Sequence, residues 1–168
     1  WEPAEVRFAD TAAAGLRTLR SEDWVLAAAI EAATAAAEAA QQEVGTDRLP
    51  RFMLHGDFTA INVLQRRSVP AAVIDFDLSH IGTRPWEFAI ARLYKALEML
   101  EGYREEAARI GIALTDEELR AIPTVYRGFR AGMIRWQLID HGLTGRPLNV
   151  PFIRRQLDLL RTPHLPAA

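Results

Sequence analysis

The chain contains no cysteine, and although 20 of its 168 residues are basic, only Lys95 is a lysine. The lack of cysteine excludes a disulfide framework, a zinc–thiolate site and a cysteine nucleophile. The sequence also lacks an apolar stretch near the roughly 20 residues of a membrane span, and it shows no signal peptide. We therefore expect a cytoplasmic protein with no membrane partner.

An excess of charge of either sign is also missing, since 20 basic residues face 22 acidic ones and the formal net charge is −2. Nucleic-acid-binding modules usually carry a basic excess on one face, so we expect no nucleic-acid partner. The length suits one domain with a buried core, and we predict a single domain over residues 1–168. The chain begins with Trp1 rather than Met, so we expect it to be part of a longer protein.

The first fifty residues have the composition of helices. Ser21 is a candidate N-cap, because two acidic residues follow it where the helix dipole favours them. An alanine-rich run from Val25 to Gln42 has high helix propensity, and Gly45 marks its expected end. We therefore predict packed helices before residue 50.

The pattern changes after Leu49. Short apolar runs at residues 51–54, 63–65 and 71–74 alternate with turn residues such as Arg66-Arg67-Ser68. Such runs are typical of small strands or hairpins. We therefore predict a small β patch in this part of the chain.

Helical signals return after a loop that holds Gly82. Pro85 suits a first helical position, and apolar residues recur at helical spacing from Trp86 to Leu100. We predict further helices over residues 103–110, 116–121 with Thr115 as N-cap, 123–141 with Gly142 as the stop, and 151–161. Helices, a small β patch and more helices together predict a mainly helical α+β fold.

Oxygen-bearing side chains gather at the ends of the predicted strands. Asp57 and Asn62 lie in the polar loop after the first strand, and Asp75 and Asp77 follow the third. Carboxylate and amide oxygens suit Mg²⁺, which proteins usually hold with one or two carboxylates plus substrate phosphates. A separate carboxylate near the metal could orient a hydroxyl and accept its proton. This set of residues indicates phosphoryl transfer, in which positioning and charge neutralisation supply most of the catalysis.

Two motifs carry a family resemblance. His55-Gly56-Asp57 with Asn62 five residues after the aspartate, followed by Ile74-Asp75-Phe76-Asp77, resembles the aminoglycoside phosphotransferase-like family. The resemblance continues into Trp86-Glu87-Phe88-Ala89 and is strong from Leu54 to Ala89. That family includes choline, homoserine and fructosamine kinases and shares the protein-kinase-like fold.

The resemblance implies roles for the four oxygen-bearing residues. Asp57 would be the catalytic aspartate that orients the acceptor hydroxyl. Asn62 and Asp75 would bind the Mg²⁺ that bridges the phosphates of ATP or GTP, and Asp77 would add a metal contact, directly or through water.

Two further residues would support the catalytic loop. The resemblance implies that His55 braces the loop and that Glu87, in place of the more usual aspartate, hydrogen-bonds its backbone. The stretch Thr59-Ala60-Ile61 departs from the common His-Pro-Gly of the family, which changes the packing of the loop but leaves the three oxygen ligands intact.

A kinase of this kind also has an N-terminal lobe with a glycine-containing phosphate loop and a strand lysine. Before His55 the chain has only the isolated glycines Gly15 and Gly45 and no lysine. We therefore expect the C-terminal lobe alone, without the N-terminal nucleotide lobe, so the nucleotide-contacting residues are unknown. Within it we expect a helical lead-in over 1–50, the catalytic and metal loops on short strands over 51–77 and a helical acceptor-side subdomain over 78–168.

The resemblance implies a small-molecule hydroxyl as acceptor, such as an aminoglycoside, an amino alcohol, a sugar or a homoserine-like compound. From Glu98 to Glu118 seven acids face two arginines, and from Arg127 to Arg161 seven arginines face two acids. We expect most of these charges to lie on solvated helix faces, so they do not identify the acceptor.

Two other interpretations stay open. Without a nucleotide lobe, the chain could be a non-catalytic kinase-like binding module, although such a module has no chemical need for Asp57, Asn62 and Asp75 together. A metal-dependent phosphohydrolase could use His55 with the aspartates, but the chain has only four histidines. We expect the isolated chain to be inactive and leave its oligomeric state open.

Overall fold

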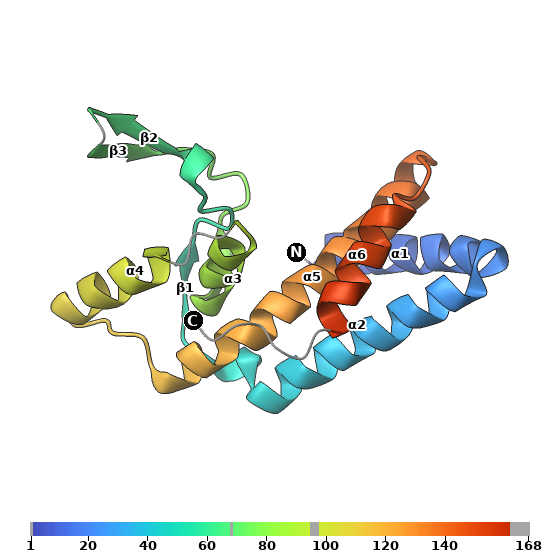
Figure 1. Ribbon diagram of the computed structural model, residues 1–168, viewed down its shortest axis with the longest axis horizontal. Helices are drawn as coiled ribbons and strands as arrows, with labels where there is room; N and C mark the ends of the chain where they lie inside the picture. Colours follow the sequence, from blue (N-terminus) through green and yellow to red (C-terminus); the bar gives the residue numbers. More distant parts are fainter. Residues whose placement is uncertain (1, 68, 95–97, 162–168) are drawn as a thin grey trace. The chain divides into compact units, whose positions relative to one another are not determined.

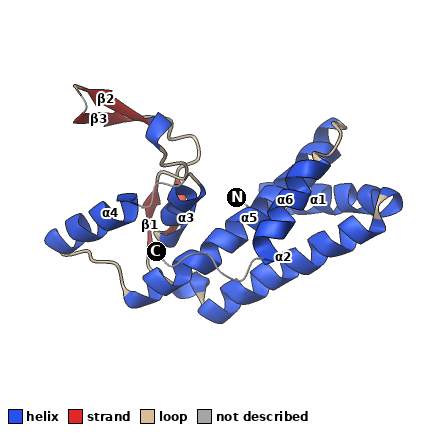
Figure 2. Cartoon of the chain, in the orientation of Figure 1, coloured by secondary structure: helices blue, strands red, loops and turns tan. Residues whose placement is uncertain are grey.

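The structure, a computed structural model, describes residues 2–67, 69–94 and 98–161, and for residues 2–9 it describes the backbone alone. Helices dominate, and the strands form two small antiparallel sheets, in agreement with the predicted α+β class (Figure 2). Within these residues no helix has both the length and the apolar character needed to cross a membrane.

The chain divides into two compact units. Unit 1 combines the residues up to Ala39 with those from Arg130 onward, and unit 2 runs from Ala40 to Phe129. Whether the two units make up one domain, as the sequence suggests, stays a prediction.

Unit 1 is a bundle of helices. It contains α1 (Glu2–Glu22), most of α2 (Trp24–Val44), the second half of α5 (Asp116–Thr144) and α6 (Val150–Arg161) (Figure 1). Its core is built from leucine, isoleucine and alanine side chains of these helices: Ala12, Leu19, Leu26, Ala27, Ile30, Ala37, Ala131, Ile134, Leu138, Ile139, Ile153, Leu157 and Leu160. Removing these apolar side chains from water is the main stabilising contribution to the unit.

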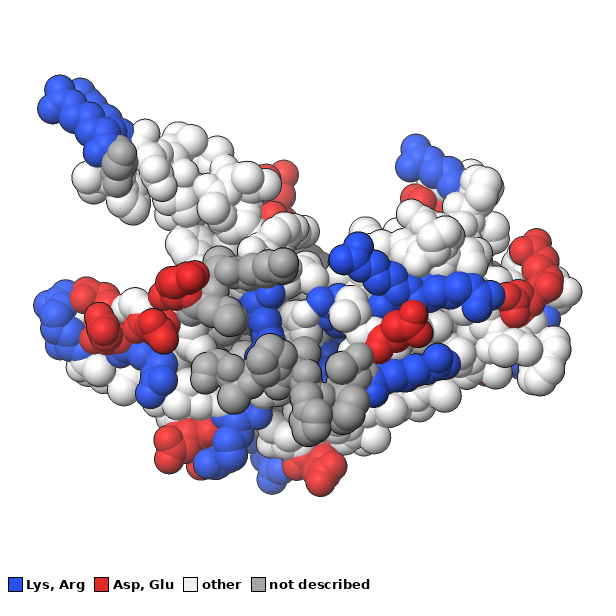
Figure 3. Space-filling view, in the orientation of Figure 1, with Lys and Arg blue, Asp and Glu red and all other residues white. Residues whose placement is uncertain are grey.

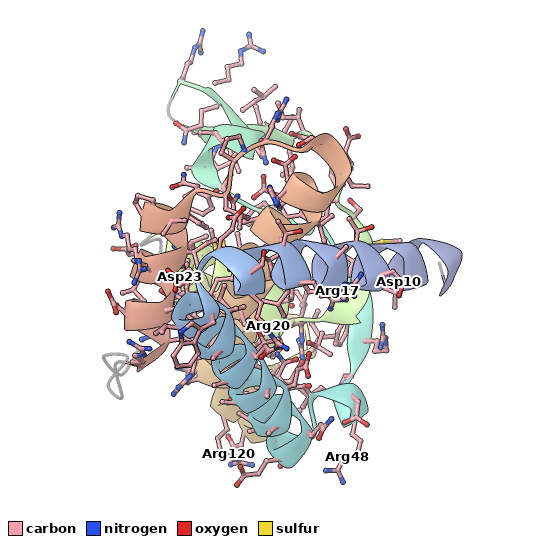
Figure 4. All side chains as sticks on the ribbon, turned by 90° about the vertical axis from the view of Figure 1, so that its right-hand side faces the viewer. Asp10, Arg17, Arg20, Asp23, Arg48 and Arg120 are labelled. Carbon is pink, nitrogen blue, oxygen red and sulfur yellow. The ribbon has the colours of Figure 1, made fainter. Side chains whose placement is uncertain are left out.

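The boundary between α1 and α2 differs from the prediction. Asp23, not Ser21, is the N-cap of α2, because its Oδ1 accepts a hydrogen bond from the backbone N of Leu26 at 2.9 Å. Asp23 lies where α1 gives way to α2 (Figure 4). Ser21 is wrong as a cap because α1 continues through it, and its hydroxyl donates to the carbonyl of Thr18 at 2.7 Å.

The end of α2 agrees with the prediction. The helix ends at Val44, and Gly45 adopts a left-handed conformation with φ of 71°. Such a conformation favours glycine, which explains why the helix stops there. A single 3₁₀ turn, η1 (Thr46–Arg48), then leads to the strands.

Among the described residues, unit 2 contains four short strands. They are β1 (Arg51–Leu54), β2 (Val63–Arg66), β3 (Val69–Val73) and β4 (His80–Thr83). Strand β1 pairs with β4, and β2 pairs with β3, each antiparallel. The chain therefore leaves the first sheet through residues 55–62, which include the 3₁₀ turn η2 (Ala60–Asn62), and returns to it through residues 74–79.

Strand β4 corrects the expected loop around Gly82. Its sequence, His-Ile-Gly-Thr, has no strong strand pattern of its own. It is extended because β1 pairs with it residue by residue, from Arg51 opposite Thr83 to Leu54 opposite His80. Of the turn predicted after β2, Ser68 lies outside the described residues and Arg67 has a φ of 53°.

The first two helices of unit 2 have other bounds than the sequence predicts. Helix α3 (Pro85–Leu93) begins at Pro85 as predicted but ends before Leu100. Residues 95–97, with Lys95, lie outside the described residues, and Glu98 to Leu100 already belong to α4 (Glu98–Arg109). A continuous apolar spacing could not distinguish one helix from two.

Helix α5 runs from Asp116 through Pro123 to Thr144, where two helices with a break at Pro123 were predicted. Proline removes one backbone hydrogen bond, but Ile122 and Val125 beside it are buried, so packing favours a continuous helix. The helix stops before Gly145, with φ of 69°, rather than at Gly142. Helix α6 begins one residue before the predicted Pro151.

Candidate functional site

The candidate site consists of the two loops that join the sheets of unit 2, residues 55–62 and 74–79. Beyond the last pair of the β2–β3 ladder, the backbone N of Ile74 donates to the carbonyl of Asn62 at 3.0 Å. This hydrogen bond places Asn62 beside the residue that precedes Asp75. Residues 12 positions apart in sequence thus meet at the base of the hairpin.

His55 connects the two loops through both ring nitrogens. Its Nδ1 accepts from the backbone N of Asp57 at 3.3 Å, so its Nε2 carries the hydrogen and donates to the carbonyl of Ile74 at 2.8 Å. The ring also lies 4.7 Å from that of Phe76, and the hydroxyl of Ser79 donates to the carbonyl of His55. With both nitrogens engaged, His55 acts on the loops and has no nitrogen left for a metal.

Asp57 and Asn62 are in direct contact. The side-chain Nδ2 of Asn62 donates to the carbonyl of Asp57 at 2.9 Å and to its Oδ2 at 3.1 Å. Because the nitrogen must face these two acceptors, the Oδ1 of Asn62 is left as an acceptor. Asn62 is 5% exposed and Asp57 is half-buried, so one carboxylate oxygen of Asp57 is held while the group stays accessible.

Gly56 and Glu87 fix the backbone before Asp57. The backbone N of Gly56 donates to Oε1 of Glu87, in the first turn of α3, at 2.8 Å. Gly56 has a φ of 85°, and a Cβ on it would lie 2.1 Å from the carbonyl oxygen of Leu78. Only glycine fits this close approach of the two loops.

Asp75 and Asp77 lie in the second loop and are exposed. Asp75 has a φ of 65°, a conformation that costs non-glycine residues about 1–3 kcal/mol and is often found at functional sites. Within the described chain, neither carboxylate has a hydrogen bond or an ion pair, so none joins Asp77 to Asp57 or Asn62.

The donor set can be compared with the needs of Mg²⁺. The described residues hold no group of three or more His, Cys, Asp or Glu side chains able to bind a metal by themselves. Asn62 and Asp75 instead offer two oxygen ligands in adjacent loops, which fits an ion that takes its other ligands from phosphates and water. Asp77 stays a predicted ligand.

The sequence did not single out a buried ion pair next to this site. Arg84 and Glu118 are 5% and 0% exposed, and the guanidinium binds both carboxylate oxygens, with Nη2 at 2.5 Å from Oε2. Burial by itself would lower the pKa of Arg84. The hydrogen bonds and charge of Glu118, together with Tyr103, raise it by more, so the net pKa lies above the ordinary value and the group stays charged.

Glu118 corrects one expectation. It was counted among acids on solvated helix faces, which holds for the other six, all of them exposed: Glu98, Glu101, Glu105, Glu106, Asp116 and Glu117. A signal for Glu118 existed in Thr115-x-x-Glu118, a capping box. The structure forms that box, with Glu118 N donating to Thr115 Oγ1 and Thr115 N donating to Glu118 Oε2.

Comparison with known proteins identifies the family. The model of the phosphotransferase enzyme family matches residues 1–127, which include both loops, Glu87, Arg84 and Glu118. Neither the curated proteins nor the solved structures contain a match to the chain. The match covers most of the sequence and includes the loops that carry Asp57, Asn62 and Asp75, so the chain belongs to the phosphotransferase enzyme family.

Proposed function

We propose that this chain is the C-terminal, catalytic-loop lobe of a kinase-like enzyme that transfers the γ-phosphoryl group of ATP or GTP to a hydroxyl of a small molecule. One observation carries the proposal: Asp57 is accessible, one of its carboxylate oxygens is held by Asn62, and its loop is tied to the loop of Asp75 by His55. Family membership supports phosphoryl transfer as the reaction class.

Asp57 orients the acceptor. Its carboxylate accepts a hydrogen bond from the acceptor hydroxyl and takes the proton as the oxygen forms its bond to phosphorus. The bond between the γ-phosphorus and the nucleoside diphosphate breaks in the same displacement. The hydrogen bond from Asn62 holds Oδ2 and leaves Oδ1 for the hydroxyl.

Asn62 and Asp75 are the residues that would hold Mg²⁺, with Asp77 as a further contact. The ion supplies neutralisation of the charge on the phosphates. The strained backbone of Asp75 and the buried amide of Asn62 support these roles, because strained backbone is concentrated at functional sites and the amide of Asn62 is already held beside Asp57.

The acceptor is a small hydroxylated compound. Unit 2 contains a cavity of about 480 Å³ between α4 and the start of α5, and its charged lining residues are Glu101, Arg104, Glu105 and Asp116. Three acids against one arginine favour an acceptor that carries amino groups. Aminoglycosides, amino alcohols and homoserine-like compounds are the first candidates, with sugars as the uncharged comparison.

Asp57→Ala tests the proposal. In the protein expressed from its complete reading frame, transfer of radiolabelled γ-phosphate from ATP and GTP to these acceptors is measured. We expect Asp57→Ala to lower kcat by roughly 10²–10⁴-fold, the usual contribution of a general base, with unchanged circular dichroism and nucleotide affinity.

The matched control is Asp47→Ala, which removes an exposed aspartate of unit 2 outside the two loops. It should keep the activity of the unaltered protein. Retention of that activity in Asp57→Ala with the best acceptor would show that Asp57 is not the general base.

A further inference from the structure

The residue before α3 and the first turn of that helix reach two separate parts of unit 2. Glu87 accepts from the backbone N of Gly56, next to Asp57. Arg84, three residues earlier, reaches the segment between α4 and α5 and the first turn of α5. One rigid turn of helix thus joins the catalytic loop to residues 112–118.

Arg84 uses all five of its N–H donors. Nε and Nη2 donate to the carboxylate of Glu118 at 2.8 and 2.5 Å. Nη1 donates to the carbonyl of Ile112 at 2.6 Å and to the hydroxyl of Tyr103 at 3.4 Å, and Nη2 donates to the carbonyl of Ala113 at 3.2 Å. The guanidinium lies 4.4 Å from the ring centre of Phe52 in β1. Only a planar fork of donors can satisfy this arrangement, so lysine cannot replace Arg84.

Stability alone is a weak explanation for such a pair. Taking two charges out of water costs about as much as their attraction returns, and well-packed apolar residues of similar size are often as stable or more so. The pair instead holds the backbone of Ile112 and Ala113 in a single conformation, because Arg84 donates to both of their carbonyls. That backbone forms a wall of the 480 Å³ cavity, to which Ala113, Leu114 and Asp116 contribute.

We propose that Arg84 and Glu118 are positioning residues that hold the cavity wall at residues 112–118 in register with the loop of Asp57, through Glu87 and Gly56. The proposal rests on the proposed function, because the cavity is taken as the place of the acceptor. The pair fixes the position of the acceptor hydroxyl relative to the Asp57 carboxylate and contacts neither.

The test compares three variants. Arg84→Met/Glu118→Leu removes both charges at similar volume, and Arg84→Lys keeps the charge but loses the fork. Glu106→Gln/Arg109→Gln is the matched control, because it removes an exposed ion pair of unit 2 that lies outside residues 112–118 and does not line the cavity. If the double variant does not fold, Arg84→Lys carries the test.

Two measurements are made on the protein from the complete reading frame. The first is kinetics: both Arg84 variants should lower kcat roughly 10- to 100-fold, as expected for misplacement of a reacting group, with the KM for the nucleotide unchanged. The second is hydrogen exchange: protection of the amides in residues 54–58 should fall at least about tenfold, while α6 keeps its protection. The control variant should change neither.

Two results would overturn the proposal. One is an Arg84→Lys variant with the kcat of the unaltered protein. The other is a loss of protection that is equal in residues 54–58 and in α6, because this would mark a general loss of stability. If the unaltered protein phosphorylates none of the acceptors, the proposed function fails, and hydrogen exchange still decides whether the pair holds the loop.

Discussion

Single residues of the candidate site are fixed by backbone geometry as much as by chemistry. Gly56 has a positive φ, and a side chain on it would collide with the carbonyl of Leu78. Asp75 has a positive φ although it is not a glycine. The two loops therefore approach closely at one point and are strained at another, which is typical of functional segments.

Gly56→Ala should destabilise the protein. The added Cβ would lie 2.1 Å from a backbone oxygen, which must move, and the φ of 85° adds strain. We expect a loss of at least about 1–3 kcal/mol in the free energy of unfolding, measured by urea denaturation.

Gly102→Ala is the control for this substitution. Gly102 lies inside α4 with open space around its Cβ position, so alanine there should stabilise the protein by roughly 0.5–1 kcal/mol. Equal effects of the two substitutions would show that the contact between the loops is not tight.

At this scale the sequence was informative where residues close in the chain act together. His55, Asp57 and Asn62 belong to one motif, and their contacts lie within the predicted loop. Arg84 and Glu118 are 34 positions apart. Neither the local sequence pattern nor a count of charges shows which of the nineteen arginines is buried, or that Glu118 is the acid that pairs with it.

At the scale of helices and strands, the ends of elements depend on which of several suitable residues is used. Ser21 and Asp23 are both good N-caps by type. Asp23 is used because the chain turns after Glu22, and its second carboxylate oxygen also binds Arg154 of α6 at 3.0 Å. That contact between distant segments is not visible in the sequence.

The two candidate caps can be separated by substitution. Asp23→Ala should lower the free energy of unfolding by about 0.5–2 kcal/mol, the usual contribution of an N-cap. Ser21→Ala should change it by less than about 0.5 kcal/mol, as for an ordinary surface position. Thermal unfolding followed by circular dichroism measures both, and a larger effect of Ser21→Ala would contradict the cap at Asp23.

Pro123 offers a second test on an element. It lies inside α5 and is exposed, so its ring removes a hydrogen bond to the carbonyl of Leu119 and makes no compensating burial. Proline inside a helix costs about 3 kcal/mol of folding free energy. Its replacement by alanine makes the unfolded chain more flexible, which reduces the gain in stability by about 1 kcal/mol. We expect Pro123→Ala to stabilise the protein by about 2 kcal/mol in urea denaturation. No gain would mean that α5 bends to accommodate the ring.

On the scale of the whole chain, segments that are far apart in sequence belong to the same compact unit. Unit 1 is made from both ends of the described chain, and unit 2 lies between them in sequence. The sequence predicted the helices of unit 1 from their composition, since alanine and leucine favour helices anywhere. It could not show that Ile30, Ile134 and Ile153 belong to one core, because that depends on contacts over more than a hundred residues.

The affinity of the chain for a nucleotide also depends on the whole molecule. A phosphate loop needs glycines free to present backbone N–H groups, and both glycines before Gly56 have other roles. Gly15 lies in α1 against the carbonyl of Leu138, and Gly45 ends α2. No lysine precedes Lys95.

We therefore expect the 168-residue chain alone to bind ATP in the presence of Mg²⁺ with a Kd above about 1 mM, which corresponds to roughly 4 kcal/mol of binding free energy. Isothermal titration calorimetry measures this, with Asn62→Ala as the comparison, since it should weaken what binding remains. Micromolar binding by this chain would show that residues 1–168 already hold a complete phosphate site.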